Sequence, residues 1–82
     1  MTELTVTASP NPSTDRFNLE IQSDKTGPVT LKVTDVNGRL IALQPGIFPN
    51  STIQVGGEWR SGIYLVEVSQ ANEKKVVRLI KL

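Results

Sequence analysis

The sequence predicts an all-β fold. Apolar and polar residues alternate with a period of two along most of the chain, which is typical of strands with one buried and one solvated face. Residues that favour turns separate these segments at intervals of about 8–12 residues. No segment shows the 3.6-residue period of an amphipathic helix. Together these observations favour a small antiparallel sandwich.

The first strands are predicted from this alternation. Leu4–Val6 forms a short opening strand, and Phe17–Gln22 alternates apolar with polar side chains over its whole length. Val29–Thr34 has the same pattern. The apolar side of each longer strand is expected to face the core, so Phe17 and Leu31 are predicted core residues.

Asn37-Gly38 predicts a β-hairpin that joins Val29–Val36 to Arg39–Leu43. The dipeptide favours a type I′ turn, because that turn needs positive φ at both central residues. Asp35, Asn37 and Gly38 also resemble the start of an EF-hand calcium loop. A loop that begins at Asp35 would place Gly46 where the bidentate Glu is needed. We therefore interpret this segment as a turn.

Three further strands complete the prediction. Ile53–Val55 is short, Ile63–Val68 is rich in β-branched and aromatic residues, and Lys75–Leu82 closes the chain. About seven short strands with turns between them fit a small immunoglobulin-like antiparallel β-sandwich. The breaks are predicted at Pro10-Asn11-Pro12-Ser13, Thr26-Gly27-Pro28, Gln44-Pro45-Gly46, Pro49-Asn50, Gly56-Gly57 and Gln70-Ala71-Asn72.

The composition restricts the chemistry of the molecule. Its 82 residues are expected to form a single domain, 1–82, with residues 1–5 as linker or expression-derived residues. The chain has no Cys and no His, so thiolate and imidazole metal ligands and His-dependent acid–base catalysis are excluded. We therefore expect no enzyme activity, no cofactor and no metal. The net charge of +1 argues against nucleic acid, and no apolar run approaches the ~18 residues of a membrane span.

Two short motifs keep alternative interpretations. Trp59 and Arg60 lie between glycines and could contact a partner, but Trp59 could equally close one end of the sandwich, which we favour. Asn50-Ser51-Thr52 matches an N-glycosylation acceptor, a tripeptide that is common by chance.

The carboxyl-terminal segment departs from simple alternation. Residues 1–73 have five basic and eight acidic side chains and sum to −3, whereas residues 74–82 have four basic and none acidic and sum to +4. Lysines that protect an edge strand against unwanted pairing explain this pattern, and so does an edge that a partner or a second copy recognises. We name this candidate the recognition strand: Lys74, Lys75, Val76, Val77, Arg78, Leu79, Ile80, Lys81 and Leu82.

Several features in a fixed order resemble a known family. These are Pro10-Asn11-Pro12, Phe17–Ile21, Val33–Arg39, Ser61–Val68 and the Lys-rich terminal strand. Over about residues 6–82, the chain resembles the type A C-terminal sorting domain of type IX secretion system (Por secretion system) cargo in Bacteroidetes.

The resemblance implies a non-enzymatic secretion signal built as a folded domain. Cargo of this family crosses the inner membrane with an N-terminal signal peptide, and the domain then directs it from the periplasm through an outer-membrane translocon. A sortase-like surface peptidase removes the domain, and the cargo is attached to the cell surface or released. The implied partners are the translocon proteins and this peptidase, and Leu82 would be the carboxyl end of the parent protein.

The resemblance also assigns roles to residues where the motifs match. The recognition strand corresponds to the family's terminal signal strand, and we expect it to be the part that is read. The remaining motif residues are expected to be mainly structural, because proline restricts and glycine widens the backbone conformation. They are Pro10, Asn11, Pro12, Gly38, Gly62 and Tyr64.

An immunoglobulin-like accessory or carbohydrate-binding module of a surface protein is the alternative. Trp59 and Tyr64 would then be stacking platforms for sugar rings. Because only these two aromatic residues are candidate platforms, this is the weaker hypothesis.

Overall fold

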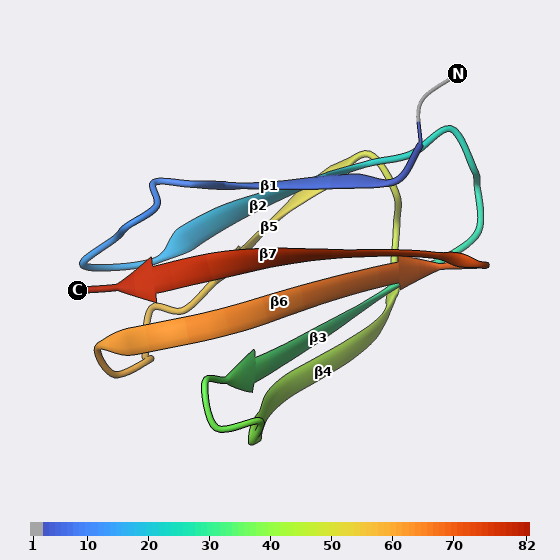
Figure 1. Cartoon of the computed structure of the whole chain (residues 1–82). Helices are drawn as coiled ribbons and strands as arrows, with labels where there is room; N and C mark the ends of the chain where they lie inside the picture. The colour runs from blue at the N-terminus through green and yellow to red at the C-terminus, as the bar shows by residue number, and fades with distance from the viewer. Residues whose placement is uncertain (1–2) are drawn as a thin grey trace.

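The computed structural model describes residues 3–82, which form seven β-strands and, in that range, no helix. The strands build two antiparallel sheets that face each other (Figure 1). The prediction of an all-β antiparallel sandwich is confirmed. Within residues 3–82 there is accordingly no helix that could span a membrane. The strands are β1 Thr5–Ser9, β2 Phe17–Gln22, β3 Val29–Asp35, β4 Leu40–Ile47, β5 Ser51–Val55, β6 Gly62–Gln70 and β7 Glu73–Lys81.

The strand order is that of an immunoglobulin-like sandwich. One sheet has the order β1-β2-β5 and the other has the order β4-β3-β6-β7. Strand β2 pairs with β5, and β3 pairs with β6, so the chain crosses repeatedly between the sheets. The edge strands β1 and β7 come from opposite ends of the chain and lie side by side (Figure 1).

The core lies between the sheets and is built by the predicted alternation. Every second residue of β2 and β3 is buried, including Phe17 and Leu31, which confirms the predicted core positions. One connected cluster contains Leu4, Phe17, Leu19, Ile21, Val29, Leu31, Val33, Ile47, Tyr64, Val66, Val68 and Leu79.

The amino-terminal boundary differs from the sequence expectation. Leu4 is fully buried and Thr5 is the first residue of β1. Both residues therefore belong to the folded unit, although the sequence suggests a linker over residues 1–5. Met1 and Thr2 lie outside the described residues.

The hairpin between β3 and β4 forms as predicted, but its turn is not type I′. Gly38 has a φ of 85°, whereas Asn37 is not among the residues with positive φ. Gly38 N donates to Asp35 O, and Asp35 N donates to Arg39 O, both at 3.0 Å. This is the three-residue loop in which a type I turn precedes a left-handed glycine. The Asp35 carboxylate stabilises it, because Oδ1 accepts hydrogen bonds from Asn37 N and Arg39 N at 2.9 Å.

A second difference lies in β4. The sequence predicts a break at Gln44-Pro45-Gly46, but the strand continues through these residues to Ile47. The pairing with β3 shifts by one residue in this region, and Gly46 has a φ of 72°, which indicates a β-bulge. Pro45 is tolerated because β4 is an edge strand, where the missing N–H removes no bond to an outer neighbour.

Candidate functional site at the carboxyl-terminal strand

Strand β7 contains most of the recognition strand and forms one edge of the four-stranded sheet. It pairs along its whole length with β6. Leu79 and Lys81 are buried on the inner face, whereas Lys74, Val76 and Arg78 are exposed on the outer face. The recognition strand therefore divides into residues that complete the core and residues that a partner can reach.

The outer edge of β7 is occupied by the loop between β1 and β2. Asn11 Nδ2 donates to Arg78 O at 2.8 Å, and Ile80 N donates to Asn11 Oδ1 at 3.0 Å. One side-chain amide thus satisfies both a carbonyl and an N–H of the strand edge, as a neighbouring strand would. The peptide bonds Ser9–Pro10 and Asn11–Pro12 are both cis.

Ser13 continues this contact with its backbone. Ser13 N donates to Ile80 O at 3.0 Å, and Leu82 N donates to Ser13 O at 2.8 Å, which makes a parallel bridge opposite Lys81. Ser13 is buried, and its Oγ accepts from Asp15 N and donates to Arg16 O. The outer edge of β7 is therefore bonded to this loop at Arg78 O, Ile80 N, Ile80 O and Leu82 N, whereas residues 74–77 keep an open edge. No feature of the sequence indicated that Ser13 would bond to the last strand.

Lys81 is a buried cation at the end of β7. Its side chain lies between the sheets and its Nζ donates to the carbonyl oxygens of Asp15 and Gly56. These carbonyls belong to the loop before β2 and the loop after β5. Lys81 therefore ties three segments together, and its charge is not displayed, in contrast to what a lysine in a terminal basic segment suggests.

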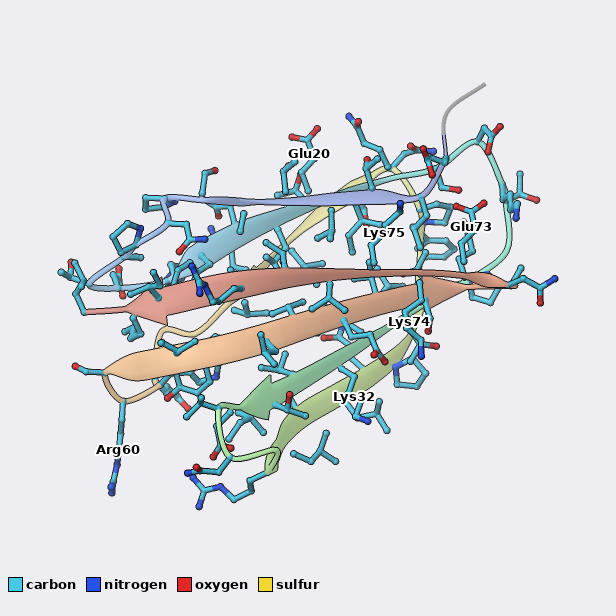
Figure 2. All side chains as sticks on the ribbon, viewed as in Figure 1. Glu20, Lys32, Arg60, Glu73, Lys74 and Lys75 are labelled. Carbon is cyan, nitrogen blue, oxygen red and sulfur yellow. The ribbon has the colours of Figure 1, made fainter. Side chains whose placement is uncertain are left out.

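The other basic residues of β7 lie on two different sides (Figure 2). Lys75 points toward the amino-terminal segment, and its Nζ lies 3.3 Å from Oε2 of Glu3, two residues before β1. Lys74 lies on the outer face, with its Nζ 3.8 Å from Glu67 Oε1. Among residues 3–82, Arg78 has no carboxylate within 4.0 Å. The displayed charge of the strand is thus concentrated at Lys74 and Arg78.

Glu73 anchors the start of β7, a role that sequence reasoning missed. Its Oε1 lies 2.9 Å from Lys25 Nζ, and its Oε2 accepts a hydrogen bond from Leu4 N at 2.8 Å. The hydrogen bond from Lys25 and then that from Leu4 N lower the pKa of Glu73 from its ordinary value of 4.5, because both favour the ionised carboxylate. Glu73 therefore joins the last strand to the residue before the first.

Comparison with known protein families identifies the family of this domain. Residues 8–82 match the family model described as the secretion system C-terminal sorting domain. The chain belongs to this family. Among curated proteins no sequence matches it. The match confirms the resemblance to type IX sorting domains, so the domain serves as a sorting signal that interacts with the secretion machinery and directs export toward the cell surface or beyond.

The glycine and tyrosine of the sorting-domain motif lie at the start of β6. Gly62 has a φ of 153°, which a residue with a Cβ rarely adopts, and it pairs with Lys81. Tyr64 is buried, and its hydroxyl donates to Arg60 O at 2.7 Å. A tyrosine near this corner that bonds back to the upstream backbone is a recurrent feature of immunoglobulin-like sandwiches. These contacts support the expected structural role of both residues.

Trp59 packs at one end of the sorting domain. Its ring stacks on Tyr64 with 4.4 Å between centroids, and its centroid lies 6.0 Å from that of Phe17. Tyr64 is buried, and Trp59 is half-buried with one face of its ring stacked on Tyr64, so the two rings do not form a displayed platform for a sugar. This packing supports the plug interpretation. Arg60 points away from the molecule into solvent (Figure 2).

Asn50, the residue of the glycosylation motif, is part of a loop contact. Its Nδ2 donates to Ser23 O at 3.0 Å, and its Oδ1 accepts from Ser23 N at 3.1 Å. Its φ is 61°, in the left-handed region that Asn tolerates. The amide nitrogen that a glycan would modify is thus engaged in joining the β2–β3 and β4–β5 loops.

The substitution Asn11→Ala removes both hydrogen bonds to the edge of β7. We expect the free energy of unfolding to fall by about 1–3 kcal/mol, since each net hydrogen bond contributes about 0.5–1.5 kcal/mol. Urea denaturation measures this change. The control Asn18→Ala, on the polar outer face of β2, should stay within about 0.5 kcal/mol of the unaltered domain. Equal stability of Asn11→Ala and Asn18→Ala would show that the edge contact contributes nothing.

The lowered pKa of Glu73 predicts a pH dependence of stability. The stabilisation from its ionised form is fully present above pH 4.5, the ordinary value, and is lost as the pH falls through the lowered folded value. Thermal unfolding between pH 2 and pH 6 should therefore show a smaller acid destabilisation for Glu73→Gln than for the unaltered domain. Glu58→Gln, in a loop, is the matched control. If the Glu73→Gln profile coincides with that of the unaltered domain, the linkage is absent.

Proposed function

We propose that this domain is a non-enzymatic carboxyl-terminal signal that directs an attached cargo from the periplasm through the outer-membrane type IX translocon. A sortase-like surface peptidase then removes the domain, and the cargo is anchored at the cell surface or released. The observation that carries the proposal is the family match over residues 8–82, which includes the whole of β7. The partners are translocon proteins and the peptidase.

The exposed residues of the recognition strand are proposed to contact the secretion machinery. Lys74, Val76 and Arg78 are exposed on one face, and residues 74–77 have an open edge. Leu79 and Lys81 hold the strand in the sandwich and are proposed to act only through the fold. The signal is therefore a surface of a folded domain, and a partner need not extract the strand.

The carbohydrate-binding alternative has little support from the packing. The two aromatic rings considered as sugar platforms, Trp59 and Tyr64, stack on each other, and Tyr64 is buried. The side chains around them belong to the core. We therefore do not propose this function.

Export of a fused reporter tests the proposed function. Residues 1–82 are placed at the carboxyl end of a periplasmic reporter and expressed in a type IX-competent bacterium and in a strain without the translocon. The reporter should reach the surface or medium only in the competent strain. The reporter without the domain is the control. Retention of the fusion in the periplasm of the competent strain would contradict the proposed function.

Variants of the same fusion test the recognition strand. Deletion of residues 77–82 removes Leu79 and Lys81 from the interior and unfolds the domain, so loss of export would not separate signal from fold. Lys74→Glu/Arg78→Glu keeps the fold and reverses the displayed charge, and should lower export. Arg39→Glu/Arg60→Glu makes the same charge change in loops and should leave export unchanged. Equal export of both double variants would remove the charge of β7 from the mechanism.

A further inference from the structure

The outer face of the three-stranded sheet is entirely polar. Antiparallel pairing places directly opposed residues on the same face, so the register defines rows of side chains across each sheet. On this sheet the inner positions Val6, Ala8, Ile53 and Val55 pack against the core. The outer rows are Ser9 with Asn18 and Gln54, Thr7 with Glu20 and Thr52, and Thr5 with Gln22.

The outer face of the four-stranded sheet is different in kind. Its rows are Thr30 with Ser69 and Lys74, then Leu43 with Lys32, Glu67 and Val76, then Leu40 with Thr34, Leu65 and Arg78, and then Ile63 with Ile80. Five of its apolar side chains are substantially exposed, from 39% for Leu65 to 59% for Leu43. We name this surface the outer apolar face: Leu40, Leu43, Ile63, Leu65, Val76 and Ile80. Glu20 and Lys32 mark the two opposite outer faces in Figure 2.

Exposed apolar side chains grouped on one sheet face indicate a contact surface. Single exposed apolar residues are ordinary, but a contiguous group on a small domain is typical of an interaction site. The polar three-stranded sheet shows that the sandwich itself does not require apolar residues on an outer face. The difference between the two sheets therefore indicates a partner that binds the outer face of the four-stranded sheet.

The outer apolar face contains a hollow of about 130 Å³. It is lined by Lys32, Thr34, Leu65, Glu67 and Val76, which belong to β3, β6 and β7. A hollow of this size accommodates part of one projecting side chain of a partner. It lies across two neighbouring rows of mixed apolar and polar side chains, between Val76 of the recognition strand and Lys32 and Thr34 of β3.

The charges on this face determine the chemistry of the partner. Lys32, Lys74 and Arg78 are basic and Glu67 is the one acidic side chain in these rows, so the face sums to +2. Two copies stacked on this face would bring like charges together, which is unfavourable. A lipid surface rich in phosphate would meet the Glu67 carboxylate in the wall of the hollow. An apolar protein surface bordered by carboxylates complements both features.

We infer that the outer apolar face is the docking surface of the domain for a protein of the secretion machinery whose contact surface is apolar and bordered by Asp or Glu. This inference rests on the proposed function and specifies the partner's chemistry. Val76 and Arg78 contribute from the recognition strand, but Leu65 and Lys32 lie on neighbouring strands. The signal is therefore a face built by four strands, and the terminal strand supplies one part of it.

Export of the reporter fusion with Leu65→Thr/Val76→Thr tests the inference. Threonine favours strands, keeps the β-branched shape of Val76 and removes apolar surface at two exposed positions, so urea denaturation should confirm that the domain folds. Export should fall by about tenfold or more, the change expected from losing two contacts at the centre of an interface. Lys32→Glu should also lower export. The control Thr7→Val/Thr52→Val, on the polar outer face, should be exported normally.

The outcomes separate this inference from the proposed function. If the unaltered fusion is exported and the Leu65→Thr/Val76→Thr fusion is exported equally well, the docking surface is wrong and the sorting function stands. If the unaltered fusion stays in the periplasm, both are wrong. Cosedimentation with phosphatidylglycerol–phosphatidylcholine vesicles that Leu65→Thr/Val76→Thr abolishes would assign the face to lipid and overturn the protein partner. A dimer in sedimentation equilibrium that the same variant dissociates would also overturn it.

Discussion

The pairing of β7 on both of its edges is the constraint on which the rest of the structure depends. Strand β6 covers one edge, and Asn11 and Ser13 cover the carboxyl-terminal half of the other. On the inner face of β7, Lys81 binds carbonyls from two loops and Leu79 packs in the core. The two ends of the chain thus stabilise each other, and a small domain without a disulfide gains a closed side.

This constraint explains how the last segment of a chain can be both a strand of the fold and a signal. On the outer edge of β7, Arg78 O, Ile80 N, Ile80 O and Leu82 N are already bonded to the loop that contains Asn11 and Ser13, so pairing with another strand there would first require release of this loop. The side chains on the outer face are available without any rearrangement. A partner can therefore bind the outer face of the sheet while the sandwich stays folded. Because one outer face is polar and the other is apolar, the apolar one is the expected binding surface.

The elements that could be predicted from the sequence are those determined by neighbouring residues in the chain. Strands β2 and β3 are evident from their alternation, because one face of each is buried, and the Asp35–Arg39 hairpin is evident from its glycine. The details that sequence reasoning missed depend on partners distant in sequence or on context. The Asp35 carboxylate stabilises a three-residue turn in place of the type I′ turn, and the edge position of β4 allows a bulge at Pro45.

The candidate site was predicted in part for the same reason. The basic composition of the last nine residues is visible in the sequence, but alternation alone does not show that Lys81 points inward. The contact of Asn11 with Ile80 spans 69 residues, and a motif between two prolines gives no indication of its target. Rows across a sheet likewise exist only once the register is known, so the outer apolar face could not be assembled from the individual strands.

Amide hydrogen exchange, measured by NMR on the isolated domain, tests the central claim that β7 is held on both edges. The account predicts that the amides of Ile80 and Leu82, which donate to Asn11 and Ser13, are protected to within about tenfold of Val66 in the centre of the sheet. The Val76 amide, on the open part of the same edge, should exchange much faster. Exchange of Ile80 and Leu82 as fast as that of Val76 would contradict the account.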